Sequence, residues 1–228
     1  GNYKQALNYI NSALKTYKDN DDVFFQTLAT INRGVSLQGL NKHKDAITNY
    51  KEGIALARLH KYKGREALLW SNMGNSYFEL EDYNNAKLSY WQSKALYKSL
   101  NYNLEISGCY NNLGKLYNKT KKLDSALYYL NNAIKISDST DFLRVLANGY
   151  HYRSNTYKLL NNYKQSLSDF EAYTTLKDSM FNEQKLKQIE ELRTIYETEK
   201  KEQFIGIQKN EIALLTAKNK VNNLQLAL

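Results

Sequence analysis

The chain has 228 residues, no proline and only 10 glycines, and it carries a formal net charge of +9. An all-β protein of this length needs many turn residues, so this composition excludes that class and favours long helices. Hydrophobic residues make up 42% of the chain, which is enough for a buried core and excludes a largely disordered protein.

A 40-residue spacing runs through the first three-quarters of the chain. Small residues stand at Gly34, Gly74, Gly114 and Ser154, and Ala6, 40 residues before Ala46, belongs to an earlier partial unit. Four other sets of residues keep a fixed offset from these small residues. Four residues before them are Thr30, Trp70, Tyr110 and Tyr150, and three residues after them are Leu37, Tyr77, Tyr117 and Tyr157. Twelve residues after them are Ala46, Ala86, Ala126 and Ser166, and sixteen residues after them are Tyr50, Tyr90, Leu130 and Phe170. We interpret each unit as two helices that approach closely at the small residues, with the aromatic residues filling the space between them.

In chain order, this spacing predicts the second helix of a truncated unit over residues 1–20. Helix–turn–helix units follow over residues 21–60, 61–100, 101–140 and 141–177. Polar residues predict short turns inside units, near 39–42, 79–82, 119–122 and 159–162. They predict longer turns between units, near 18–22, 59–64, 100–103 and 138–141. Residues 178–228 contain no turn cluster and predict one long helix.

The order of a large aromatic residue, a small residue and a tyrosine, followed by alanine and an aromatic residue, resembles the tetratricopeptide (TPR) repeat. Residues 70–77 and 110–117 carry it most clearly, and the resemblance covers about residues 3–177. It implies an all-α, right-handed solenoid that binds other molecules. The 40-residue unit and the missing proline imply longer helices, as in kinesin light chains and bacterial peptide-pheromone receptors.

The resemblance implies that the first helix of each unit lines a concave groove that binds a protein or peptide ligand. The groove positions carry Asn32, Asn72, Asn75, Asn111, Asn112, Lys115, Asn118, His151, Asn155 and Lys158. An asparagine side chain offers two donors and an acceptor, so a ladder of them can pair with a peptide backbone of any sequence. The alternative is that asparagine simply occupies wetted surface in an asparagine-rich chain.

Heptad spacing near the end of the chain predicts a coiled-coil-like seam for a second helix, and hence a homodimer. The seam residues are Ile207, Leu214, Val221, Leu224 and Leu228. The alternative is that this helix folds back on its own solenoid.

Residues 178–183, 189–192 and 196–201 resemble a junction found in bacterial TPR-containing sensor histidine kinases and membrane-anchored transcriptional regulators. This resemblance implies the periplasmic, ligand-sensing part of an inner-membrane signalling protein, with a membrane contact only through a segment after Leu228. The start at Gly1 rather than Met indicates a trimmed or processed chain. The alternative is a cytoplasmic TPR adaptor or a peptide-pheromone-type receptor.

We expect no catalysis, metal or cofactor in these residues. His43, His60 and His151 lack metal spacing, and no glycine-rich phosphate loop or nucleophile motif is present. Cys109, the single cysteine, excludes an intramolecular disulfide and is expected to be a small buried hydrophobic residue. The net charge lies before Asp178, but the groove positions carry more asparagine than lysine, so we expect no nucleic-acid partner.

Overall fold

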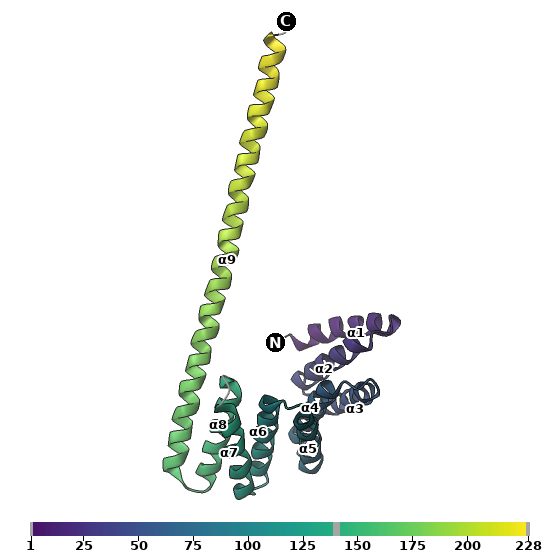
Figure 1. The fold of residues 1–228 in the computed structure, drawn as a ribbon, viewed down its shortest axis with the longest axis vertical. Coiled ribbons are helices and arrows are strands. Elements are labelled where there is room, and N and C mark those ends of the chain that lie inside the picture. The colour runs from purple at the N-terminus through teal and green to yellow at the C-terminus, as the bar shows by residue number, and fades with distance from the viewer. Residues whose placement is uncertain (1, 139–141, 227–228) are drawn as a thin grey trace. The chain divides into compact units, whose positions relative to one another are not determined.

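The computed structural model describes residues 2–138 and 142–226, and all regular structure in these ranges is helical (Figure 1). The helices are α1 (Tyr3–Asp19), α2 (Val23–Gly39), α3 (His43–Leu59), α4 (Lys63–Glu79), α5 (Tyr83–Ser99), α6 (Asn103–Lys119), α7 (Leu123–Asp138), α8 (Leu143–Leu159) and α9 (Tyr163–Leu226). The all-α prediction is confirmed. The chain divides into two compact units, residues 1–177 and 178–228.

The helices of the first unit repeat every 20 residues because their connections have the same length. Each described connection, from 20–22 to 160–162, has three residues. Its middle residue has a positive φ: Asp21, Asn41, Lys61, Glu81, Asn101, Lys121 and Asn161. The N–H of Lys42 donates to Leu37 O at 2.9 Å and that of Asn41 to Gln38 O at 2.9 Å, which is the Schellman pattern of helix ends. The prediction of longer turns between units is therefore wrong at 20–22, 60–62 and 100–102. The polar residues on either side of these three-residue connections belong to the neighbouring helices.

The small residues of the 40-residue pattern lie where two helices of a pair meet. A Cβ added at Gly74 would lie 2.6 Å from Cε1 of Tyr90, and one at Gly34 or Gly114 would overlap the side chain of Tyr50 or Leu130. Tyr50, Tyr90 and Leu130 are at most 1% exposed. A side chain at these glycines would displace a core residue, so the pattern fixes how closely the helices approach.

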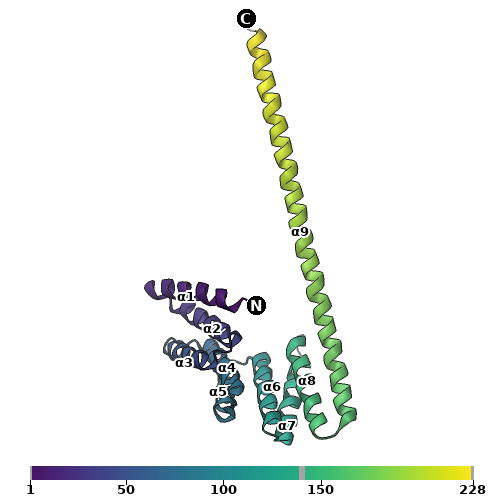
Figure 2. The ribbon, with the colours of Figure 1, turned by 180° about the vertical axis from the view of Figure 1, so that it is seen from behind.

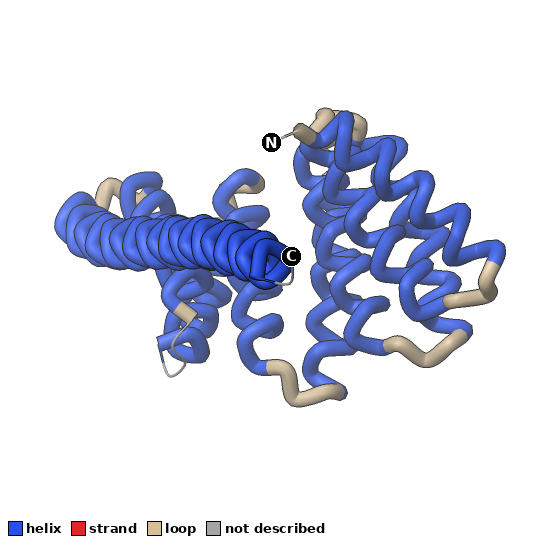
Figure 3. The backbone as a smooth tube through the Cα atoms, turned by 90° about the horizontal axis from the view of Figure 1, so that it is seen from above, coloured by secondary structure: helices blue, strands red, loops and turns tan. Residues whose placement is uncertain are grey.

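The helices follow one another in chain order (Figure 2), and the tube view shows neighbouring helices joined by short loops (Figure 3). In addition, α2 packs against α4, α4 against α6, and α6 against α8. We call these four the A helices and α1, α3, α5 and α7 the B helices. Since the A helices contact each other directly, one face of the array is built from A helices alone.

The last pair of helices in the first unit uses polar contacts where the others use glycine and alanine. The hydroxyl of Ser154 donates to Ser166 O at 2.7 Å, and that of Ser166 donates to Ser154 O at 3.0 Å. Arg153 donates to both carboxylate oxygens of Asp169 at 2.7 Å, and the Asp169 side chain is only 7% exposed. A largely buried, two-point ion pair of this kind holds the part of α9 within the first unit, up to Lys177, against α8.

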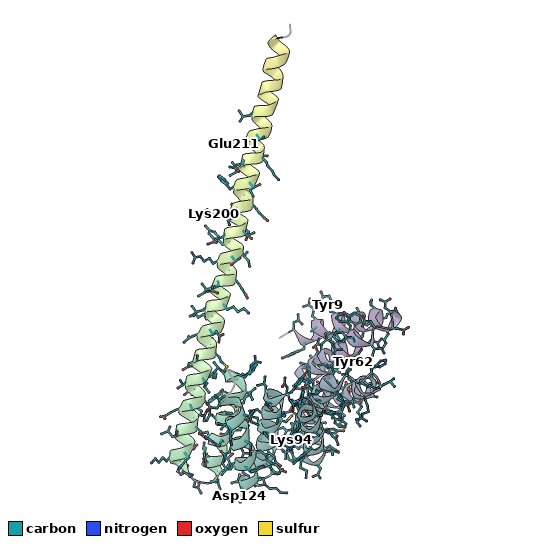
Figure 4. The ribbon with its side chains drawn as sticks, in the orientation of Figure 1. Tyr9, Tyr62, Lys94, Asp124, Lys200 and Glu211 are labelled. Atoms are coloured by element: carbon teal, nitrogen blue, oxygen red, sulfur yellow. The ribbon has the colours of Figure 1, made fainter. Side chains whose placement is uncertain are left out.

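The long helix that the sequence predicts from Asp178 begins earlier, at Tyr163, because no turn residue interrupts the chain between them. In the second unit, Lys200 and Glu211 project into solvent (Figure 4). Among the described residues, no helix is long and apolar enough to cross a membrane.

Candidate functional site

The A-helix face is held together by side-chain amides at two of its three junctions. Between α2 and α4, the amide nitrogen of Gln38 donates to Asn72 O at 2.7 Å and to Ser76 Oγ at 2.8 Å. The hydroxyl of Tyr50 donates to Gln38 Oε1 at 3.1 Å, so the bridging amide is itself held in place.

The junction between α6 and α8 repeats this arrangement two units later. The amide nitrogen of Asn118 donates to Tyr152 O at 3.0 Å, and the hydroxyl of Thr156 donates to Asn118 Oδ1 at 2.8 Å. A second amide, that of Asn111, donates to Val145 O at 2.8 Å. Asn111 and Asn118 were predicted as ligand-binding residues, but both of their amide groups bond to α8.

The junction between α4 and α6 has a phenyl ring at the same repeat position. Phe78 is 5% exposed and stands where Gln38 and Asn118 stand in the other units. Lys115 Nζ lies 4.1 Å from the centre of this ring and 3.4 Å from Glu79 Oε1. The side chains of Lys115 and Glu79 are 35% and 52% exposed, so water screens this ion pair and its contribution to stability is small.

A cavity of about 220 Å³ opens on the A-helix face between α4, α6 and α8. Its lining includes Leu68 and Ser71 of α4, Glu105, Gly108, Cys109, Asn111 and Asn112 of α6, and Val145, Asn148 and Tyr152 of α8. A Cβ added at Gly108 would meet no atom within 4 Å, so the absence of a side chain there leaves open space. We call this the groove cavity.

Polar groups in the groove cavity suit a hydrogen-bonding ligand. Asn111 is 3% exposed, and its Oδ1 has no hydrogen-bond partner among the described residues. An unpaired buried acceptor of this kind is uncommon in folded proteins. Asn112 and Asn148 add further donors and acceptors, and Glu105 contributes a carboxylate.

Cys109 is 1% exposed, and burial raises the pKa of its thiol to about 11. Its Sγ lies 3.4 Å from the hydroxyl oxygen of Ser93. The thiol is therefore protonated and unreactive at neutral pH, in keeping with the role of a small buried hydrophobic residue.

The remaining predicted groove residues divide by environment. Asn75 accepts a hydrogen bond from the buried Tyr90 hydroxyl at 2.9 Å and so supports the core. Asn32, Asn155 and Lys158 are exposed, and Asn72 is half-buried. The structure brings Asn111 and Asn112 together in the groove cavity and does not bring the other predicted residues into it.

His151 lies half-buried against α9. Its ring centre is 4.7 Å from that of Tyr173, and its Nδ1 is buried without a partner among the described residues. Burial and the nearby charge of Lys177 lower the pKa of His151. The ring is therefore neutral at pH 7 and packs against the end of the array.

Gly108 and Asn148 are groove-cavity residues that were missing from the predicted set. Both stand six residues before the small residue of their repeat, at Gly114 and Ser154. With the small residue counted as position 8 of the first helix of a unit, this is position 2, which the TPR resemblance places toward the groove along with positions 5, 6, 9 and 12. The repeat pattern therefore contains the signal that identifies Gly108 and Asn148.

Of the predicted seam residues, the structure describes only the side chain of Ile207, which is 57% exposed. The side chains of Leu214, Val221 and Leu224, and residue Leu228 as a whole, lie outside the described residues. In the part of the chain that the structure describes, no cluster of His, Cys, Asp and Glu could hold a metal ion.

Comparison with known proteins identifies the repeats. Residues 67–99 and 107–140 match the tetratricopeptide repeat family. A comparison with curated protein sequences found no match.

Three solved structures share the fold of the array. BtubC (BKLC) from P. vanneervenii is 15% identical with a TM-score of 0.69, and the match covers 79% of this chain and 75% of that one. A Rap protein complexed with competence and sporulation factor is 16% identical with a TM-score of 0.57, over 79% of this chain and 60% of that one. A signal transduction ATPase (STAND protein) with a tetratricopeptide repeat sensor, from Pyrococcus horikoshii, is 18% identical with a TM-score of 0.66. The match covers 80% of this chain and 29% of that one.

These matches confirm that the array is a TPR solenoid. The TPR fold is a scaffold for binding protein or peptide partners.

Proposed function

We propose that the A-helix face binds an extended peptide, or an extended segment of a partner protein, at the groove cavity. The observation that carries this proposal is the composition of the cavity. It lies between three A helices with Tyr97 of α5 also in its lining, it contains the open space beside Gly108, and Asn111, Asn112 and Asn148 line it. Extended peptides carry a backbone donor and acceptor at each residue, which side-chain amides can pair with whatever the peptide sequence is.

A sensory role for this binding is the finer part of the proposal. The Rap protein that shares the fold was solved with competence and sporulation factor, and the STAND protein carries its TPR array as a sensor. Residues 178–201 resemble the junction of bacterial sensor histidine kinases and membrane-anchored regulators. We infer a ligand-sensing region that acts outside the cytoplasm. A cytoplasmic adaptor or peptide receptor is the alternative, and it predicts that the binding partner is cytoplasmic.

The second unit supports a role for residues 178–228 in self-association. Phe181, Leu186, Ile189, Leu192, Ile195, Tyr196, Phe204, Ile205, Ile207, Ile212 and Leu215 are each at least 49% exposed. Leu186, Ile189, Tyr196 and Ile207 recur at heptad positions. A stripe of this kind is stabilised when a second helix covers it, and a second copy of the chain supplies a matching stripe. A parallel homodimer would give the sensor a defined connection to its output.

The groove is tested by selecting random peptides displayed on phage against the whole chain and against two tryptophan variants. Gly108→Trp fills the groove cavity, and Gly206→Trp adds the same side chain on α9, where a Cβ also meets no atom within 4 Å. We expect selected peptides to bind the parent and Gly206→Trp, and to lose binding to Gly108→Trp. Peptides that bind all three proteins equally, or a selection that yields no binder, would contradict the groove proposal.

Sedimentation equilibrium tests the dimer separately. We expect a concentration-dependent dimer that Ile207→Lys dissociates. Gln208→Lys places the same charge on the neighbouring residue, outside the heptad seam, and should leave the dimer intact. A chain that stays monomeric at all concentrations would contradict the dimer and leave the groove proposal standing.

A further inference from the structure

A second cavity, of about 330 Å³, lies between α3 and α5 and reaches the side of α4. Trp70 and Tyr77 of α4, Lys51 and Ile54 of α3, and Leu88 and Ser89 of α5 contribute to its lining. Trp70 and Tyr77 lie on the opposite side of α4 from Leu68 and Ser71, which line the groove cavity. We call this second cavity the outer slot.

The next unit along the chain fills the corresponding space with one of its own side chains. The ring of Tyr129 stacks on Tyr117, with centres 5.3 Å apart and planes 6° apart. It also lies 5.8 Å from Tyr110 and meets Trp91 edge to face at 6.2 Å. Lys94 Nζ completes this aromatic cluster, 3.6 Å from the centre of the Trp91 ring.

Each member of this cluster has a counterpart 40 residues earlier, and all the counterparts line the outer slot. Tyr117 corresponds to Tyr77, Tyr110 to Trp70, Trp91 to Lys51 and Lys94 to Ile54. Tyr129 corresponds to Ser89, which is 1% exposed and whose hydroxyl donates to Asn85 O at 2.8 Å. The outer slot is therefore the site of an aromatic ring that the chain supplies in one unit and lacks in the unit before it.

The charges around the outer slot favour an acidic partner. Lys51 is exposed at its edge, and the carboxylate of Asp82 beside it accepts a hydrogen bond from the amide of Asn85, another lining residue, at 2.6 Å. The acidic residues of α3, Asp45 and Glu52, line a different cavity, between α2 and α3.

Arg58 also lines the outer slot, but its charge is already balanced. It donates two hydrogen bonds to Glu66 Oε1, at 2.7 and 2.9 Å. Lys51 thus remains to attract a carboxylate of the partner.

We propose that the outer slot binds an aromatic side chain of a partner protein, carried on a segment with acidic residues beside the ring. The ring stacks against Trp70 and Tyr77 as Tyr129 stacks against Tyr110 and Tyr117. A carboxylate beside it meets Lys51. Aromatic pairs in this arrangement are stabilised by more than the area they bury. This surface is distinct from the peptide groove, so its occupant is a second partner.

Fluorescence of Trp70 reports directly on the outer slot. The chain has 2 tryptophans, so Trp91→Phe leaves Trp70 as the only one. The probe is a synthetic pentapeptide with one tyrosine between two pairs of glutamates, and its counterpart has alanine at the centre. In the Trp91→Phe background, we expect the tyrosine peptide to change the Trp70 emission saturably at millimolar concentration, and the alanine peptide to leave it unchanged.

Two substitutions in this background locate the binding. Ser89→Tyr supplies the missing ring and should abolish the response. Lys51→Glu changes an exposed residue without disturbing the core and should weaken binding about tenfold or more. Lys15→Glu makes the same charge change on exposed α1 and should leave binding unchanged. The proposal is overturned if the tyrosine peptide gives no saturable response, if the alanine peptide binds equally well, or if neither Ser89→Tyr nor Lys51→Glu weakens binding.

Discussion

The three junctions between A helices differ in how they are held, although they occupy the same position in the repeat. Gln38 and Asn118 bridge their junctions with amide hydrogen bonds, whereas the middle junction has Phe78 at that position. Hydrogen bonds are directional and fix one helix against the next at a set register. Apolar contact is not directional and tolerates small displacements. The groove cavity opens at the middle junction, beside α4 and α6, where Lys115 contacts α4 through a solvent-exposed ion pair with Glu79 and through the ring of Phe78.

This difference indicates where the array can adjust to a ligand. We expect α2 with α4, and α6 with α8, to move as pairs, and any change in curvature on binding to occur between α4 and α6. A repeat array is stabilised mainly by interactions between neighbouring units, so each junction can be weakened separately and its contribution measured.

The largest effect should come from Phe78→Ala. The ring is 5% exposed and also meets Tyr83 edge to face at 5.6 Å, so its loss leaves a cavity at the middle junction. We expect the free energy of unfolding in urea to fall by about 3–5 kcal/mol. Phe170→Ala removes a ring that is 48% exposed and should cost about 1 kcal/mol or less. Equal losses for the two variants would show that the middle junction does not depend on burial of Phe78.

The sequence predicts the helix pairs of the array but not the contacts that hold neighbouring A helices together. The 40-residue spacing of Gly34, Gly74 and Gly114 predicts the helix pairs and their close approach, because a small residue has one clear role there. The alternation of Gln38, Phe78 and Asn118 is also visible at a fixed position. The hydrogen bonds of Gln38 and Asn118 to the next A helix could not be predicted, because they depend on the distance between helices that are 40 residues apart in sequence.

The length of the turns and the continuity of α9 were also not predicted from the sequence. The turns are closed by residues such as Lys61 and Glu81 in a conformation that glycine usually adopts, so the composition did not reveal their length. The continuity of α9 from residue 177 to residue 178 was not predicted, because the second helix of the last repeat was interpreted as ending before the long helix begins.

A smaller effect is expected from Asn118→Ala, at an amide-bridged junction. The substitution removes two hydrogen bonds to α8, but Thr156 keeps its hydroxyl bond to Tyr152 O at 3.0 Å. We expect a loss of about 2 kcal/mol, since each such bond contributes about 1 kcal/mol net. Hydrogen exchange should show faster opening in α8 than in α2 and α4. Asn155→Ala, at an exposed asparagine of α8, is the control and should change neither stability nor exchange. Uniform faster exchange along the whole array would contradict an independent junction.

The smallest effect should come from Lys115→Met, which keeps an unbranched apolar stem beside Phe78 and removes the charge. Because the ion pair with Glu79 is exposed and 3.4 Å long, we expect the free energy of unfolding to change by less than about 0.5 kcal/mol, and the change to vanish at high salt. A double-mutant cycle with Glu79→Gln measures the pair directly, and urea unfolding of the four proteins supplies its terms. A coupling above about 1 kcal/mol would mean that the middle junction is held by charge, and binding across the groove cavity should then depend strongly on salt. A coupling near zero leaves burial of Phe78 as the main link between α4 and α6, which is the condition under which a ligand in the groove cavity can shift one half of the array against the other.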